Sequence, residues 1–177
     1  MYELWNLDPT KSPPTDYTIG IDSLEVMIKK IEEHPSPIYK IKVGDEGDLE
    51  KLIQIRKQTT SIIRIDANAG WSLDQAVNML PVLEGLGIEL VEQPLAKDDF
   101  EGTAKLKALT QIPIIADESC VGMMDIEKCK DVFSGINIKL TKCSGITPAR
   151  RMITKARELD MKIMIGCMNE SSVGTAA

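Results

Sequence analysis

The chain contains almost no histidine, few aromatic residues and none of the common nucleotide-binding motifs. Of its 177 residues, only His34 is a histidine, and aromatic residues make up 4%. A single histidine, in a Pro-flanked polar stretch that we expect to be an exposed loop, excludes a His-based metal cage or a Ser-His-Asp triad within the chain. Neither G-x-x-x-x-G-K-[ST] nor G-x-G-x-x-G occurs, which removes the usual nucleotide fingerprints.

Metal-binding cysteine pairs, basic stripes and long apolar runs are absent as well. The four cysteines, Cys120, Cys129, Cys143 and Cys167, form no C-x-x-C pair, so we expect reduced and mostly buried thiols. A net charge of −6 argues against a nucleic-acid partner. No apolar run approaches the roughly 18 residues of a membrane span, and no signal peptide opens the chain. We therefore expect a cytoplasmic protein without a nucleic-acid or membrane partner.

Short apolar runs alternate with amphipathic helical patterns along most of the chain. The runs are continuous rather than alternating, as in parallel strands that are covered on both faces. The seven candidate strands are Tyr17–Ile21, Ile38–Val43, Ile62–Ala67, Ile88–Gln93, Ile112–Asp117, Gly135–Leu140 and Lys162–Met168. Helical stripes lie between them, the first formed by Leu24, Met27, Ile28 and Ile31.

Capping patterns mark several helix ends. Ser72 with Gln75 predicts a capping box, and Asp98-Asp99 predicts a cap for the following helix. Thr147-Pro148 predicts an N-cap followed by proline in the first turn. Pro81 is expected to kink the end of its helix.

This α/β alternation fits an open doubly wound sheet or a TIM-type (β/α) barrel. Polar residues end successive strands at intervals of 22 to 28 residues, and such equivalent units favour the barrel. A complete barrel has eight strands in roughly 250 residues. We therefore predict an incomplete barrel of about seven strands over residues 16–177. The Pro-rich residues 1–15 are predicted to be a lead-in segment.

Charged residues occur where a barrel places its active site, at the carboxyl ends of the strands. A charge next to a buried strand is costly unless it is paired or ligated. The residues are Lys40, Lys42, Asp66, Glu92, Asp117 and Lys139.

The three carboxylates follow successive strands and should lie close together. Unpaired, they would repel one another, and a hard divalent cation with oxygen ligands would relieve this repulsion. We therefore predict that Asp66, Glu92 and Asp117 bind Mg²⁺. The alternative is a buried ion network in which these acids pair with the lysines.

Lys42 and Lys139 follow the second and sixth strands, so they should approach the predicted metal site from opposite sides. A substrate carboxylate on the metal would place its α-proton between them. One lysine could remove that proton, giving an enediolate, and the other could return a proton to the opposite face. A single base would instead favour elimination or cycloisomerisation.

Seven stretches of the sequence resemble the enolase superfamily, in its muconate-lactonising-like branch, and within it the dipeptide epimerases of the L-Ala-D/L-Glu epimerase type. Each motif alone is weak, but their order and spacing from about residue 15 onward are specific. They are Thr-Asp-Tyr-Thr-Ile-Gly-Ile-Asp at 15–22, Lys-Ile-Lys-Val-Gly at 40–44, Asp-Ala-Asn-Ala-Gly-Trp at 66–71, Val-Glu-Gln-Pro-Leu at 91–95, Ala-Asp-Glu-Ser at 116–119, Asn-Ile-Lys-Leu-Thr-Lys-Cys-Ser-Gly at 137–145 and Gly-Cys-Met-Asn-Glu-Ser at 166–171.

The resemblance implies a Mg²⁺-dependent isomerase, specifically an epimerase of dipeptides, with the same metal ligands and the same two acid/base lysines. It further implies that Lys40 binds the substrate carboxylate. The remaining positions that it places against or near the substrate are Thr18, Cys167, Met168 and Glu170. The implied substrate is a dipeptide or an N-acyl amino acid, and the complete protein is expected to be a homo-oligomer.

The chain departs from the family pattern in four ways. Ala69 stands where the family often has Gln, and Ser144 where it has a second Gly. The family's N-terminal capping domain and its eighth strand with an Asp-x-Asp motif are expected to be missing, so residues 1–15 would come from the capping-domain side.

Three other functions stay open. The first is another muconate-lactonising-like enzyme, such as an o-succinylbenzoate synthase, an N-acylamino acid racemase or a cycloisomerase. The second is an inactive barrel fragment. The third is a class I aldolase that uses Lys139 as a Schiff base.

Overall fold

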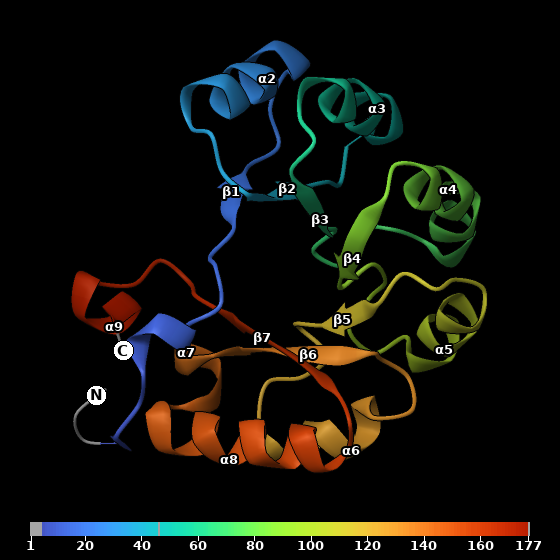
Figure 1. The fold of residues 1–177 in the computed structure, drawn as a ribbon. Coiled ribbons are helices and arrows are strands. Elements are labelled where there is room, and N and C mark those ends of the chain that lie inside the picture. The colour runs from blue at the N-terminus through green and yellow to red at the C-terminus, as the bar shows by residue number, and fades with distance from the viewer. Residues whose placement is uncertain (1–4, 46, 177) are drawn as a thin grey trace.

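In the computed structural model, seven parallel strands form one curled sheet with helices on its outer side (Figure 1). The structure describes residues 5–45 and 47–176. Each strand pairs with its neighbours in chain order, so the predicted incomplete (β/α) barrel is confirmed. The strands are β1 (Tyr17–Ile19), β2 (Ile38–Lys42), β3 (Ile62–Asp66), β4 (Ile88–Glu92), β5 (Ile114–Ala116), β6 (Gly135–Lys139) and β7 (Lys162–Gly166).

Each predicted strand is present, and each is shorter than the apolar run that predicted it. The largest difference is at β5, expected from Ile112 and found at Ile114–Ala116. Pro113 has no N–H to donate to a strand ladder, which explains the later start.

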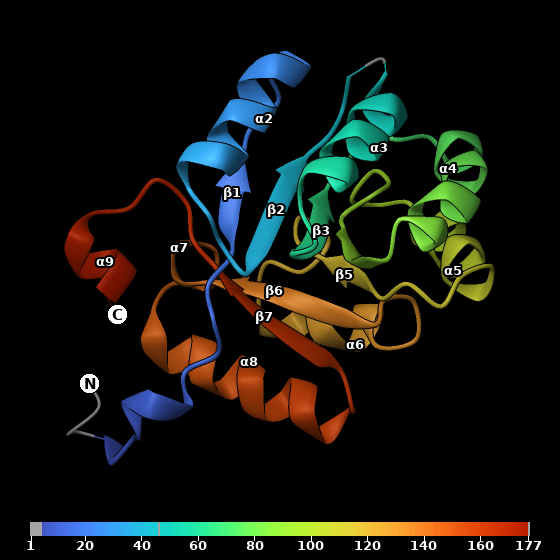
Figure 2. The same ribbon diagram turned by 45° about the horizontal axis from the view of Figure 1, so that its top comes forward.

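Helices follow most strands and pack against the outer face of the sheet (Figures 1 and 2). The helical elements are η1 (Pro9–Lys11), α2 (Leu24–Glu33), α3 (Asp48–Gln58), α4 (Leu73–Gly85), α5 (Phe100–Ala108), η2 (Met123–Asp125), α6 (Ile126–Cys129), α7 (Leu140–Cys143), α8 (Ile146–Glu158) and α9 (Ser172–Ala176).

Local chemistry sets most of the helix starts. Ser72 and Gln75 form the predicted capping box at α4, and the Asp99 side chain caps α5 by accepting from the Gly102 N–H. The prediction for α8 was wrong: Gly145 precedes the helix, and Thr147 lies inside its first turn. A glycine with φ of 116° provides the sharp turn into α8, so no side-chain cap is needed.

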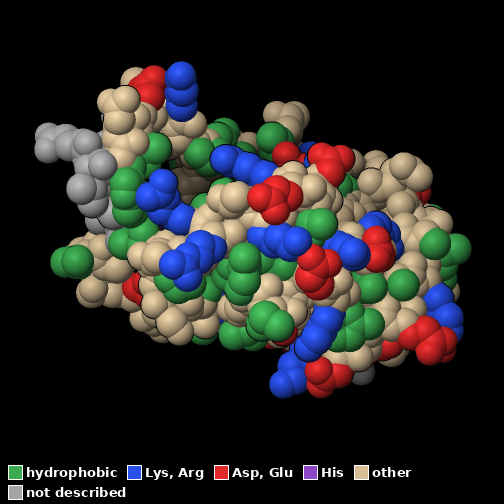
Figure 3. Space-filling view, turned by 90° about the horizontal axis from the view of Figure 1, so that it is seen from below, with side chains coloured by type: hydrophobic (Ala, Val, Ile, Leu, Met, Phe, Trp, Pro, Cys, Tyr) green, Lys and Arg blue, Asp and Glu red, His purple; other side chains and the backbone are tan. Residues whose placement is uncertain are grey.

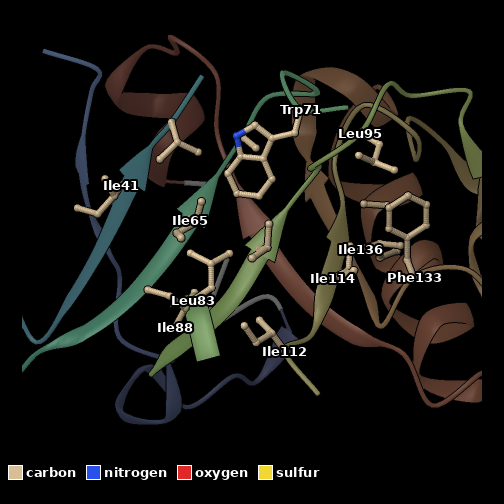
Figure 4. Close-up of a cluster of buried hydrophobic side chains, with 14 of the residues drawn as sticks. Ile41, Ile65, Trp71, Leu83, Ile88, Leu95, Ile112, Ile114, Phe133 and Ile136 are labelled. Atoms are coloured by element: carbon tan, nitrogen blue, oxygen red, sulfur yellow. The ribbon is translucent and has the colours of Figure 1, made fainter. Parts of the chain in front are cut away.

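The core lies between the sheet and the helices, and Figure 4 shows part of it around Ile65, Trp71 and Leu83. Cys120, Cys129 and Cys143 are buried in agreement with the sequence, whereas Cys167 is exposed. The three buried thiols fill space in the core as small hydrophobic groups.

The segment before β1 passes along α8 and then enters the sheet (Figure 2). Residues 1–4 of the predicted lead-in lie outside the described residues. The Arg150 guanidinium lies 4.4 Å from the centre of the Trp5 ring, which joins this segment to α8. Arg64 contacts Asp16 at 3.0 Å and Glu89 at 2.6 Å, so one side chain ties the start of β1 to β3 and β4.

The surface is of mixed charge. On the face shown in Figure 3, acidic and basic side chains are interspersed with apolar ones. A contact of 2.6 Å between Lys155 and Glu127 joins α8 to α6. His34 is exposed as predicted, and its ring stacks on Tyr17. In the part of the chain that the structure describes, no helix combines the length and apolarity required to cross a membrane.

Candidate functional site

The carboxyl ends of the parallel strands bring most of the predicted site residues together. In the sheet register, Lys42 lies opposite Asp66, and Asp66 lies opposite Glu92. Both carboxylates are buried, with exposed fractions of 1% and 0%. The sheet therefore fixes a row of charged groups across β2, β3 and β4, in which the two carboxylates are shielded from water and the Lys42 side chain is partly exposed.

Lys40 lies between two of the acids. Its Nζ is 3.0 Å from Asp66 Oδ2 and 2.6 Å from Glu92 Oε2. Burial alone would lower the pKa of Lys40, but the charges of Glu92 and Asp66 outweigh burial and raise it above its ordinary value. Lys40 is therefore a permanent cation that the two acids share.

Glu92 has no contact with bulk water. Burial raises the pKa of Glu92; the Lys40 charge lowers it, and nearby Asp66 raises it further, leaving a net increase. Asn137 on β6 donates from Nδ2 to Glu92 Oε1 at 2.7 Å. Asn137 is itself fully buried, and its Oδ1 has no hydrogen-bond partner among the described residues.

Asp117, after β5, is held by two lysines. Lys139 and Lys142 donate to its Oδ2 and Oδ1, each at 2.5 Å. Burial would raise the pKa of Asp117, but these two hydrogen bonds and the lysine charges lower it below its ordinary value. This carboxylate is therefore kept ionised.

Lys142 is a site residue that the sequence reasoning missed. Besides Asp117 Oδ1, its Nζ donates to the backbone carbonyls of Asp117, Cys120 and Asn137. Lys142 lies in the short helix α7, which begins directly after Lys139 at the carboxyl end of β6, and a lysine in the segment that follows a strand end could have indicated this role.

Gln93 was also missed, although it organises the backbone around Asp117. Its φ of 37° is left-handed, and its side chain is fully buried. Oε1 accepts from the Asp117 and Ser119 N–H groups, and Nε2 donates to Leu95 O and Ser119 Oγ. Gln93 thereby fixes the ends of β4 and β5 relative to each other.

Lys42 and Lys139 come from opposite parts of the curled sheet, β2 and β6 (Figure 1). Lys42 Nζ contacts Asn68 Oδ1 at 2.7 Å and Asp66 Oδ2 at 3.3 Å. The Lys42 side chain is 36% exposed, whereas that of Lys139 is 10% exposed. Two amine groups therefore flank the carboxylates from separate strands.

The residues expected near the substrate are less tightly organised. Thr18 lies beside Lys40 in the strand register, with an exposed side chain. Cys167 and Met168 directly follow β7 and are exposed, and Glu170 Oε1 accepts from the Met168 N–H at 3.1 Å. Among the described residues, no hydrogen bond or ion pair links these last three to the lysine–carboxylate cluster.

The carboxylates pair with lysines in this structure. Within residues 5–45 and 47–176, no three His, Cys, Asp or Glu side chains converge as a metal-binding cluster. The chemistry of the donor set nevertheless suits a hard cation, because Asp66, Glu92 and Asp117 offer only carboxylate oxygens. Moreover, the Lys40 ammonium already lies within 3.0 Å of two of these acids, so the pair can share one cation.

The chain is similar to known proteins in both sequence and fold. The chain is 50% identical over 177 residues to the L-Ala-D/L-amino acid epimerase of Maribacter sp., covering 100% of the chain and 52% of that relative. A dipeptide epimerase from Cytophaga hutchinsonii, solved with Mg and the dipeptide D-Ala-L-Val, superposes with a TM-score of 0.91 at 33% identity, over 98% of this chain and 50% of that one.

A dipeptide epimerase from Enterococcus faecalis, solved with Mg and L-Leu-L-Tyr, gives a TM-score of 0.88 at 35% identity, over 93% of this chain and 49% of that one. The chain thus spans about half the length of the relatives it matches. Residues 25–177 match the family described as Enolase C-terminal domain-like. Since this match covers most of the sequence, the chain belongs to the enolase C-terminal domain-like family.

Proposed function

We propose that the protein containing this chain is a Mg²⁺-dependent dipeptide epimerase. The observation that carries the proposal is the pair of lysines, Lys42 on β2 and Lys139 on β6, on either side of three buried carboxylates. The relatives named as epimerases, and the similar structures solved with Mg and dipeptides, support it.

Asp66, Glu92 and Asp117 would hold the metal. Their oxygen-only donor set, their burial and their origin on neighbouring strands β3, β4 and β5 support this assignment. When bound, Mg²⁺ would supply positive charge that stabilises the negative charge developing on a substrate carboxylate.

The lysines would move the proton. In its amine form, Lys42 would accept the α-proton of the substrate, and the ammonium of Lys139 would return a proton to the opposite face of the same carbon. Reversal of these roles would convert the other stereoisomer. Lys40, a permanent cation beside Asp66 and Glu92, would bind the substrate carboxylate.

Four further residues would line the substrate site. We assign Thr18, next to Lys40 in the register, and the segment after β7 to dipeptide contacts. The exposure of Thr18, Cys167 and Met168 supports this, because substrate-contacting groups must be accessible. Glu170 is included because it accepts from the Met168 N–H and so orders that segment.

A deuterium-exchange screen tests the proposed function. The chain is studied alone and in a fusion, in which it replaces the 177 matching residues of the Maribacter relative. Dipeptides and N-succinyl amino acids are incubated in heavy water with Mg²⁺ and analysed by mass spectrometry. We expect the fusion to introduce deuterium at the α-carbon of the C-terminal residue of dipeptides, and EDTA to abolish this exchange.

The unmodified Maribacter relative is the positive control. Exchange by the relative but not by the fusion would contradict the proposal for this chain. Exchange of N-succinyl amino acids in preference to dipeptides would replace the dipeptide substrate with an N-acyl amino acid. Exchange that persists in EDTA would rule out the metal-dependent reaction.

A further inference from the structure

Among the described residues, Asn68 makes the shortest hydrogen bond with the Lys42 amine. Lys42 Nζ donates to Asn68 Oδ1 at 2.7 Å, compared with 3.3 Å to Asp66 Oδ2. The Lys42 side chain is more than a third exposed, so packing alone leaves its end free to move. A neutral amide oxygen can accept from the ammonium and from the amine, since both carry N–H groups.

The backbone of Asn68 places its side chain at the end of β3. Its φ is 43°, in the left-handed region that asparagine tolerates better than most residues. Its N–H donates to Asp66 Oδ1 at 3.1 Å, which fixes the turn directly after the strand. The Asn68 side chain is therefore directed by the same turn that positions Asp66.

Glu118 determines which end of the amide faces Lys42. Asn68 Nδ2 donates to Glu118 Oε1 at 3.4 Å. An ammonium group can only donate and an ionised carboxylate can only accept, so the amide must present Oδ1 to Lys42 and Nδ2 to Glu118. The other oxygen, Glu118 Oε2, is buried and has no hydrogen-bond partner among the described residues. Within the described residues, the Glu118 carboxylate therefore accepts its hydrogen bond from Asn68.

We propose that Asn68 is a positioning residue for Lys42, and that Glu118 acts by orienting the Asn68 amide. Together they form the chain Glu118–Asn68–Lys42, which joins the loops after β5 and β3 to β2. Its catalytic consequence rests on the proposed function. Lys139, whose Nζ contacts Asp117, lies outside this chain of contacts. Asn68 should consequently affect one of the two proton transfers and leave the other intact.

The substitution Asn68→Gly tests this directly, because glycine adopts a left-handed backbone without strain. The matched control is Asn6→Gly, at an exposed asparagine with φ of 49° near the start of the chain. Exchange of the α-proton is measured in the fusion, separately from each stereoisomer of one dipeptide. Asn68→Gly should slow exchange about tenfold to hundredfold from the stereoisomer that Lys42→Ala also slows. Exchange from the other stereoisomer, and both rates in the control, should stay unchanged.

Equal slowing of both stereoisomers by Asn68→Gly, or no slowing, would overturn the proposal. Glu118→Leu removes the acceptor of the amide and should slow the same stereoisomer by a smaller factor. If Glu118→Leu instead slowed exchange from the opposite stereoisomer, or slowed neither, the orienting role of Glu118 would be refuted.

A second measurement separates this inference from the proposed function. Nitrogen-15 relaxation of the lysine side chains reports how strongly each Nζ is ordered, with no need for turnover. Asn68→Gly should reduce the order parameter of Lys42 Nζ and leave that of Lys40 unchanged. An unchanged Lys42 order parameter would overturn the positioning role. Reduced order in a fusion that catalyses no exchange would instead retain that role and refute the proposed function.

Discussion

The charges at the site are distributed so that no carboxylate depends on a single partner. Asp66 contacts Lys40 and Lys42, Glu92 contacts Lys40 and Asn137, and Asp117 contacts Lys139 and Lys142. Buried ionised groups are tolerated when they are paired and hydrogen-bonded in this way. The lysine assigned to binding and the lysines assigned to proton transfer therefore also help to hold the acids in place.

Lys142 provides a test of this arrangement that does not depend on catalysis. Lys142→Met removes an ammonium that contacts four oxygen atoms and leaves Asp117 Oδ1 without its charged partner. We expect the free energy of unfolding to fall by about 3 kcal/mol, as measured by urea denaturation. The control Lys130→Met, at an exposed ion pair on the surface, should change it by less than about 0.5 kcal/mol. A loss below about 1 kcal/mol at Lys142 would show that Lys139 alone satisfies Asp117.

At the residue scale, the sequence identified charged residues more reliably than their contacts. Lys40, Asp66 and Glu92 lie together as expected, because the strand register follows from the spacing of the repeat. The roles of Gln93 and Lys142 were not predicted, since each depends on contacts between different loops. The pairing of the acids with lysines corresponds to the alternative that the sequence left open, and the metal assignment stays a prediction.

The helices and turns between the strands set the positions of the site residues. Left-handed backbone occurs at Asn68 and Gln93, which directly follow the carboxyl ends of β3 and β4, and at Ser144, which ends α7. A left-handed residue turns the chain sharply, so that the backbone changes direction directly after the strand or helix that precedes it. At Asn68 and Gln93 the cost of this conformation is borne by residues that contact the site.

Ser144 allows that cost to be measured. It ends α7 with φ of 70° and ψ of 30°, and its side chain is exposed. Ser144→Gly should raise the free energy of unfolding by about 0.5–1 kcal/mol, because glycine relieves left-handed strain although it also gains freedom in the unfolded chain. Ser144→Ala keeps the Cβ atom and should give no gain. Equal stability of the glycine and alanine variants in thermal denaturation would contradict this explanation.

At the element scale, the alternation of strands and helices was predictable, whereas element ends were less so. The Ser72 capping box and the Asp99 cap follow from side chains next to their own helices, and both are present. The start of α8 was misplaced because Gly145 turns the chain through its backbone, a signal that Thr147 and Pro148 obscured. Backbone conformation without a capping side chain leaves little trace in a sequence.

Across the whole molecule, the sheet holds two lysines apart and the acids between them. The strand order β1 to β7 places β2 and β6 far from each other in the sheet and across its curl (Figure 1). Ile165 on the outer strand β7 is 60% exposed, so this edge presents apolar surface.

We propose that Lys42 and Lys139 transfer protons on opposite faces of one carbon. The most direct measurement is α-deuterium exchange by the fusion from each stereoisomer of one dipeptide, comparing Lys42→Ala, Lys139→Ala and the double variant with Lys29→Ala at the surface. We expect the two single variants to lose exchange from opposite stereoisomers, by about a hundredfold or more. The double variant should show no exchange, and Lys29→Ala should behave as the unmodified fusion. Loss from the same stereoisomer in both single variants, or full exchange in the double variant, would contradict the two-lysine reaction.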